Sequence, residues 1–313
     1  MWLAADQWRL ESFAMPITVY PITPGFAAEI GDSDLSQPLA AGEVEAIKQA
    51  FWNFSVLVFP EQRLTEKQHL DFAAHIGPLE TSIAALNKDA KLRIHAELAD
   101  VSNLNLRNEI WSEASRLRAL AQANRLWHTD SSFKYLPARA SLLYARNIPP
   151  IGGHTEFADL RAAYDALPDD LQHRLPGLVS DHSLAQSRSR TGFNSFTEEE
   201  RKNLPPVPQV IVRTIPENGR RSLYLASHAG MIRGMSEADS IALIDRLIAH
   251  ATQRQFVYTH RWRLHDLVMW DDRCTMHRGT DYDDLRFQRD MQRATVSDIA
   301  NTCEQEGIAV AAA

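Results

Sequence analysis

The sequence predicts an α+β fold in which many short strands form a double-sheet jelly roll and the helices gather on one side. Strand-like runs of three to five residues recur from residue 17 to residue 258. Clear helical patterns are few, at residues 39–53, after Thr65 and at 236–251. Short strands combined with segregated helices favour such a layered architecture.

The N-terminal elements follow from local patterns. Residues 17–20 read as a first strand, and a helix over 39–53 leads into an apolar strand at 55–59. A second helix starts at Thr65, because Gln68 three residues later completes a capping-box pattern, and Gly77-Pro78 ends it. We give residues 1–15 no function and treat them as a lead-in.

Residues 80–125 carry several charges and few periodic signals, which predicts a long mobile loop over a site or a disordered segment. Further strands are expected at 140–144, 155–157, 210–213, 222–225 and 256–258. The clearest helix, 236–251, places one apolar stripe on the core: Ile241, Ile244, Leu247, Ile248 and Ala251.

The motif His128-Thr129-Asp130 carries the first chemical signal. If residues 126–132 form a strand, side chains two apart point to the same face, so His128 and Asp130 project together. Trp127 then turns to the opposite face and packs in the core. By itself, His-x-Asp favours a buried structural histidine beside a turn aspartate.

A third ligand is available about 150 residues later. The apolar run 266–270 reads as a buried strand that delivers His277 just beyond its end, and Trp270 packs in the core. Two histidines and one carboxylate on one face leave about three of six metal positions open, as in non-heme Fe(II) oxygenases. Zinc favours a closed tetrahedron or a single open site, so iron is the better candidate.

Arg289 and Arg293 lie four residues apart downstream of His277. In a strand this spacing places both guanidinium groups on one face, where arginine suits bidentate capture of carboxylates. One arginine can serve a carboxylate cosubstrate and the other an acidic substrate. A solvated, arginine-rich edge strand is the alternative. Lys88 is a further candidate for attracting an anionic substrate into the cleft, or a solvated loop lysine.

Composition limits the class of protein. The chain has 313 residues with 33 Lys and Arg against 40 Asp and Glu, a net charge of −7, which argues against nucleic-acid or acidic-membrane binding. The two cysteines, Cys274 and Cys303, fit neither a disulfide framework nor a zinc site, so we expect a cytoplasmic protein. No run approaches 18 apolar residues. We expect a single domain over 16–300 and a C-terminal tail at 301–313.

The order of these motifs resembles the Fe(II)/2-oxoglutarate dioxygenases of the taurine dioxygenase type. The resemblance rests on His128-x-Asp130, then Gly152-Gly153-His154-Thr155, then His277 and an arginine about a dozen residues on, and it runs from about residue 17 to 298. It implies a double-stranded β-helix core, jelly roll and cupin-like, with flanking helices. It also implies Fe(II) as metal, 2-oxoglutarate and O2 as cosubstrates, and a homo-oligomer.

Carried over residue by residue, the resemblance makes His128, Asp130 and His277 the catalytic metal ligands. Thr155 and Arg289 then bind the distal carboxylate of 2-oxoglutarate. The same resemblance assigns substrate contacts to Arg293 and to Asn124. Asp272 and Ala85 occupy positions where this type of enzyme leads us to expect Asn and Lys.

The implied reaction hydroxylates an aryloxyacetate such as 2,4-dichlorophenoxyacetate at its ether methylene. Oxidative decarboxylation of 2-oxoglutarate gives succinate and CO2, and the hydroxylated substrate collapses to a phenol and glyoxylate. A sulfonate such as taurine, or another small anion, is the alternative substrate. A metal-binding jelly-roll protein without turnover is an alternative of another class. A zinc hydrolase is less supported, because no general-base glutamate accompanies the His-x-Asp motif.

Overall fold

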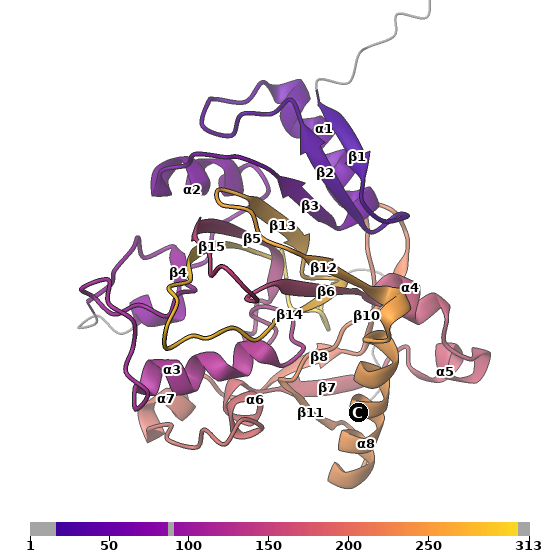
Figure 1. Cartoon of the computed structure of the whole chain (residues 1–313). Helices are drawn as coiled ribbons and strands as arrows, with labels where there is room; N and C mark the ends of the chain where they lie inside the picture. Colours follow the sequence, from indigo (N-terminus) through magenta and orange to yellow (C-terminus); the bar gives the residue numbers. More distant parts are fainter. Residues whose placement is uncertain (1–16, 87–90, 306–313) are drawn as a thin grey trace, which may run out of the picture.

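A seven-stranded sheet dominates the computed structural model, which describes residues 17–86 and 91–305. Its strand order is β1-β2-β3-β13-β5-β15-β4, and all neighbours are antiparallel except β2 and β3 (Figure 1). Its strands are β1 (Thr18–Pro21), β2 (Ala27–Gly31), β3 (Val56–Phe59), β4 (Leu98–Asp100), β5 (Ala138–Asn147), β13 (Leu267–Asp271) and β15 (Asp290–Ser297). The predicted strands at 17–20, 55–59, 140–144 and 266–270 are confirmed.

Both faces of this sheet are covered by other elements. Alternate residues of each strand point to opposite sides, so each strand contributes side chains to both layers. Leu57 and Phe59 of β3 pack with helices α1 (Ala41–Phe54) and α2 (Glu66–Ala74) on the outer face. Val56 and Val58 pack on the inner face with Phe157 from another sheet. Both helices were predicted, and the Thr65 capping box is present. Figure 1 shows them against the large sheet, away from the other strands.

Smaller sheets complete the core behind the inner face. A three-stranded sheet of β12 (Val257–His260), β6 (Thr155–Asp159) and β14 (Thr275–Gly279) is antiparallel throughout. A second one contains β11 (Ala229–Ile232), β7 (Val179–His182) and β8 (Val207–Val210), and β9 (Val212–Thr214) pairs with β10 (Arg221–Leu223). The shown architecture is therefore α+β with several sheets.

Helix α8 (Glu237–Ala251) confirms the strongest helical prediction. Ser236 caps it, and Ile244, Leu247 and Ala251 are buried against helix α4 (Leu160–Asp165) and the smaller sheets, while Ile241 and Ile248 are half-buried. Helix α5 (Asp169–Arg174) adds Leu171 to the same cluster. No described helix combines the length and the apolar character that crossing a membrane requires.

The segment expected to cover the site contains short ordered elements. These are η1 (Ile83–Leu86), β4, α3 (Arg116–Ala121) and η2 (Gln122–Arg125). Lys88 lies outside the described residues, as do all of residues 1–15 and residues 306–313 of the C-terminal tail. Helices α6 (Leu184–Ser189) and α7 (Glu198–Asn203) lie on the side of the molecule near α3 (Figure 1). The short η3 (Arg254–Phe256) links α8 to β12 and contacts α4.

Two predictions about strands near the site are wrong in detail. The expected strand at 126–132 is reduced to a single bridge, in which His128 and His277 exchange backbone N–H···O bonds of 3.0 and 2.8 Å. The chain then turns, and Ser131 adopts a positive φ of 50°. His277 does not follow β13 directly, because it lies in β14 after the turn at 272–274. A bulge at the start of β15 leaves Arg289 just before the strand.

Candidate active site

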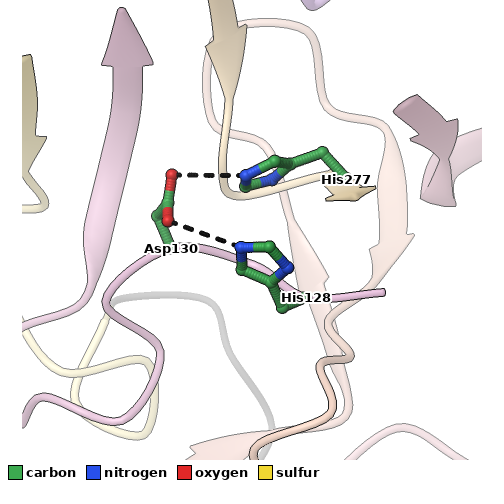
Figure 2. Close-up of side chains that lie close together, drawn as sticks. All are labelled: His128, Asp130 and His277. Carbon is green, nitrogen blue, oxygen red and sulfur yellow. Dashed lines mark ion pairs between the residues drawn. The ribbon is translucent and has the colours of Figure 1, made fainter. Parts of the chain in front are cut away.

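Three buried side chains converge at the His128–His277 bridge. The Nε2 atom of His128 lies 3.9 Å from Asp130 Oδ1, and His277 Nε2 lies 3.7 Å from Asp130 Oδ2 (Figure 2). One potential ligand atom from each residue falls within 4.8 Å of the others, which is close enough to share one ion. Among the described residues this is the one group of His, Cys, Asp or Glu that meets this criterion.

A hydrogen bond fixes which atom of His128 can act as a ligand. His128 Nδ1 donates to the Leu126 carbonyl at 2.7 Å, because a carbonyl can only accept, and this leaves the Nε2 lone pair on the side of Asp130. Burial lowers the pKa of both His128 and His277, so both rings are neutral. Neutral imidazole nitrogens and a carboxylate fit a first-row divalent metal.

Asp130 stays ionised although it is buried. Burial opposes its charge, but the charge of Arg293 and a hydrogen bond from Ser141 outweigh burial and lower its pKa. Arg293 Nη1 forms a short ion pair with Asp130 Oδ1, and Ser141 Oγ donates to Oδ2 at 2.9 Å. A ligand carboxylate held on both oxygens by the protein has a fixed orientation.

Asp272 stabilises the turn that contains Asp130. Its Oδ1 accepts the Asp130 backbone N–H and Trp270 Nε1–H, both at 3.1 Å. Burial, followed by the nearby charge of Asp130, raises its pKa well above the usual value for aspartate. A neutral carboxyl group offers the same carbonyl oxygen as an asparagine side chain. This explains how aspartate can occupy a position where the sequence comparison led us to expect asparagine.

The predicted cosubstrate residues line a small cavity of about 130 Å³ beside the three convergent side chains. Thr155 begins β6, and Arg289 reaches the same cavity from the start of β15. Arg289 Nε donates to the Gly153 carbonyl at 3.2 Å, while Asn103 Oδ1 accepts the Arg289 backbone N–H at 2.8 Å. Burial lowers the pKa of Arg289 to about 10, so it remains charged.

The Gly152-Gly153 turn allows this approach. Both glycines have positive φ, 76° and 65°, and a Cβ at Gly152 would lie 2.3 Å from the Asp281 carbonyl oxygen. Trp262 Nε1 donates to Thr155 Oγ1 at 3.0 Å. Because indole is only a donor, the Thr155 hydroxyl accepts this bond and keeps its own hydrogen for another acceptor.

A second, larger cavity of about 450 Å³ lies on the other side of His128. The segment 80–134 supplies most of its apolar wall, including Ile94, Leu98 and Phe133. His128, Asn124 and Arg293 line both cavities, so the convergent side chains lie where the two meet. The volume is within the range of small-molecule sites.

The two tryptophans next to the motifs behave differently. Trp127 packs as expected, with the Arg278 guanidinium 4.7 Å from its ring centroid. Trp270 is a buried core residue as predicted, but it does not face away from the site. Its ring centroid lies 4.6 Å from that of His277, and it lines the smaller cavity.

Sequence reasoning missed several residues at these cavities. Arg188 lines the larger cavity beside His228, whose ring lies 6.2 Å from that of His128. Trp262 and Asn103 hold Thr155 and Arg289 respectively. These residues lie in segments without a motif, so no local signal identified them.

A family model described as "Taurine catabolism dioxygenase TauD, TfdA family" matches residues 18–295. The chain belongs to this dioxygenase family. A 2,4-dichlorophenoxyacetate dioxygenase dependent on alpha-ketoglutarate, from Cupriavidus pinatubonensis, is 43% identical over 91% of this chain and 99% of its own length. An (S)-phenoxypropionate/alpha-ketoglutarate-dioxygenase from Sphingobium herbicidovorans is 33% identical over 85% of this chain and 90% of its own.

Solved structures agree with the family assignment. This TauD, TfdA family member superimposes on AAD-2 in complex with Mn(II) and N-oxalylglycine with a TM-score of 0.88 and 44% identity. The match covers 91% of this chain and 99% of that one. The chain is therefore a 2-oxoglutarate-dependent dioxygenase, as the resemblance in its sequence indicated.

Proposed function

We propose that this dioxygenase uses Fe(II) and 2-oxoglutarate to hydroxylate an aryloxyacetate, such as 2,4-dichlorophenoxyacetate, at the ether methylene. The observation that carries the proposal is a His-Asp-His cluster between a small cavity lined by Thr155 and Arg289 and a larger cavity with an apolar wall. Similarity over nearly the whole chain to 2,4-dichlorophenoxyacetate dioxygenases supports the substrate class.

In this proposal, His128, Asp130 and His277 hold the iron. When bound, the iron supplies activation of O2, coupled to decarboxylation of 2-oxoglutarate to succinate and CO2. The protein contributes neutral imidazoles, one ionised carboxylate, and hydrogen bonds that orient His128 and Asp130. Three protein ligands on one face leave room for the cosubstrate and oxygen.

We assign the distal carboxylate of 2-oxoglutarate to Thr155 and Arg289. Arg289 provides a buried charge, and among the described residues no carboxylate lies within 4 Å of it. Thr155 can donate its hydroxyl hydrogen because Trp262 occupies its acceptor role. The two groups can therefore bind a carboxylate in the small cavity.

We assign the substrate to the larger cavity, with its carboxylate near Arg293 and its ring against the apolar wall. Asn124 lies between the two cavities and can orient the substrate there. Lys88, which we expected to attract an anionic substrate, lies outside the described residues. Attack at the methylene follows from placement, because the protein fixes which C–H bond approaches the metal.

The product chemistry follows from the position of the new hydroxyl group. Hydroxylation of the carbon between the ether oxygen and the carboxylate gives a hemiacetal. The hemiacetal loses its O–H proton as the bond between the hydroxylated carbon and the ether oxygen breaks. The ether oxygen stays on the ring and takes up a proton, which releases a phenol and glyoxylate. No further oxidant is required for this last step.

Three broader assignments accompany this function. The layered sheets and the family support a jelly-roll core of the double-stranded β-helix type within a single domain. Family resemblance supports a homo-oligomer. Reduced cysteines support a cytoplasmic location.

The test compares prime substrates under identical conditions. Protein loaded anaerobically with Fe(II) and 2-oxoglutarate is exposed to O2 with 2,4-dichlorophenoxyacetate, with taurine, or with neither, and succinate and phenol are measured. We expect one phenol per succinate with the aryloxyacetate only. Succinate stimulated by taurine alone would assign a sulfonate substrate. Bound iron without turnover would instead favour the metal-binding protein without catalysis.

A further inference from the structure

The larger cavity contains more positive charge than one substrate-binding arginine provides. Five basic side chains line it: Lys91, Arg93, Lys134, Arg188 and Arg293. Carboxylates of the protein engage three of them. Arg93 contacts Asp100 and Asp290, Lys134 contacts Glu80, and Arg293 contacts Asp130.

Arg188 is different, because its half-buried side chain has no such partner among the described residues. It lies in the last turn of α6, and no carboxylate oxygen of the described residues is within 4 Å of its guanidinium. Nη1 makes only a long 3.5 Å bond to Ser187 Oγ, and Nε is buried without an acceptor. Burial lowers the pKa of Arg188 to about 10, so the group remains charged at neutral pH.

The surroundings place Arg188 at the reactive end of the cavity. The negative charge of Asp130 and the positive charge of Arg293 both influence the pKa of Arg188. His228, which also lines the cavity, packs against Phe133 with ring centroids 4.8 Å apart, and its buried Nε2 has no partner in the described chain. This wall therefore carries polar groups that no described residue satisfies with a hydrogen bond.

A buried cation without a partner costs free energy, and an anion in the cavity removes that cost. The planar guanidinium group suits a carboxylate, to which it can donate two parallel hydrogen bonds. Arg293 shares its charge with Asp130, whereas Arg188 has its full charge available.

We propose that Arg188 is a second substrate-binding arginine, which holds the carboxylate of the aryloxyacetate together with Arg293. The inference rests on the proposed function, because it takes the aryloxyacetate as the ligand of the larger cavity. It adds a specificity role, since two guanidinium groups at one end favour an anionic over an uncharged ligand by charge as well as by shape.

The test measures binding rather than turnover. The full-length protein is loaded with Mn(II) and N-oxalylglycine and titrated calorimetrically with 2,4-dichlorophenoxyacetate. We expect Arg188→Gln to raise the Kd at least tenfold, which is about 1.4 kcal/mol, and Arg188→Lys to raise it less because the charge remains. The Kd of N-oxalylglycine should stay within twofold in each variant.

Arg190→Gln is the matched control. Arg190 lies two residues further along the chain, is exposed and pairs with Asp245 outside both cavities. We expect this variant to bind 2,4-dichlorophenoxyacetate within twofold of the wild type.

An uncharged ligand separates recognition of the carboxylate from a structural role. With 2,4-dichloroanisole, which lacks the carboxylate, wild type and Arg188→Gln should have the same Kd, and the melting temperature of the variant should not fall. Equal weakening for both ligands, or an unchanged Kd for the aryloxyacetate, would overturn the inference. If the wild type itself binds N-oxalylglycine but no aryloxyacetate, the proposed function fails instead.

Discussion

Asp130 has two tasks at the residue scale, because it faces two imidazoles and also balances the charge of Arg293. A change at Asp130 should therefore affect metal binding, whereas a change at Arg293 should affect the substrate. The family motif identified both residues from the sequence. It did not reveal that they form one ion pair, because that contact depends on β15 pairing with β5.

We predict that Asp130→Ala loses Fe(II) and activity together. Changes that only disturb the support of a metal ligand cost about 10- to 100-fold in affinity, so loss of the ligand itself should exceed about 100-fold. Bound iron after anaerobic loading and desalting measures this effect. Retention of one Fe(II) per chain would show that Asp130 is not a ligand.

We predict that Arg293→Ala keeps its iron but raises KM for the aryloxyacetate. Loss of a charged hydrogen bond of about 1.5–3 kcal/mol corresponds to roughly a 10- to 150-fold increase. Steady-state kinetics at saturating 2-oxoglutarate, with the same iron assay, separates the two effects. Full loss of iron in this variant would contradict the assignment of Arg293 to the substrate.

Substitutions at Asp272 test whether this position requires only the acceptor oxygen Oδ1. We predict that Asp272→Asn retains Fe(II) affinity within about threefold, because the amide oxygen can accept the same two N–H groups. Asp272→Leu leaves both donors buried without an acceptor, which should lower the free energy of unfolding by about 3 kcal/mol. Urea denaturation of the two variants gives the comparison, and equal stability would contradict this role.

At the element scale, the connection between β12 and β13 positions a residue of β6. Trp262 lies in this connection, and its indole bond to Thr155 directs the threonine hydroxyl hydrogen away from the indole. The His260 ring packs edge-on against Trp262 with centroids 4.6 Å apart and pairs with buried Asp266. This packing restrains the orientation of the indole.

We predict that Trp262→Phe raises KM for 2-oxoglutarate by about 2- to 10-fold, the effect of one hydrogen bond of 0.5–1.5 kcal/mol. KM for the aryloxyacetate and the iron content should not change. Thr155→Ser is the control, because serine keeps the hydroxyl group. If Trp262→Phe and Trp262→Ala leave KM for 2-oxoglutarate unchanged, the indole does not position Thr155.

Strand β7 contains a buried titratable group outside the proposed chemistry. His182 is fully buried, and its ring stacks on that of Tyr224 with centroids 6.0 Å apart. Neither ring nitrogen has a hydrogen-bond partner among the described residues. Burial lowers the pKa of His182 from 6.5 to about 3. Below pH 6.5, His182 therefore binds a proton in the unfolded state that it does not bind in the folded state. The free energy of unfolding consequently falls as pH decreases towards 3.

We predict that His182→Phe reduces the acid sensitivity of the fold. At 1.36 kcal/mol per pH unit below 6.5, His182 should account for about 2 kcal/mol of the stability lost between pH 7 and pH 5. Phenylalanine keeps a flat ring against Tyr224 without titrating. Denaturation curves at both pH values check this, and an identical pH 5 deficit in variant and wild type would exclude His182 as the cause.

Local signals predicted some elements better than others. The Thr65 capping box and the apolar stripe of α8 are contained in the sequence around them, and both elements form where expected. The prediction of a strand at 126–132 was wrong, because only a single long-range bridge forms there, between His128 and His277. The chain turns directly after it and so places Asp130. Strands β7 and β11 carry no clear alternation, so they escaped prediction.

At the scale of the whole molecule, the site lies where several layers meet. His128 follows η2, His277 comes from β14 of a small sheet, and Arg293 from β15 of the large one. The sequence could identify these residues because a family motif links them across about 150 positions. Arg188 could not be found in this way, because only the folding of α6 beside β11 brings it to the same cavity.

The most direct test of the central claim follows the fate of the methylene hydrogens. 2,4-Dichlorophenoxyacetate carrying two deuterium atoms on the ether methylene is turned over with 2-oxoglutarate and O2, and the products are analysed by mass spectrometry. Attack at the methylene predicts glyoxylate that carries one deuterium atom, formed in equal amount to the phenol and to succinate. A hydroxylated product that retains both deuterium atoms, with no glyoxylate, would contradict the proposed placement of the substrate.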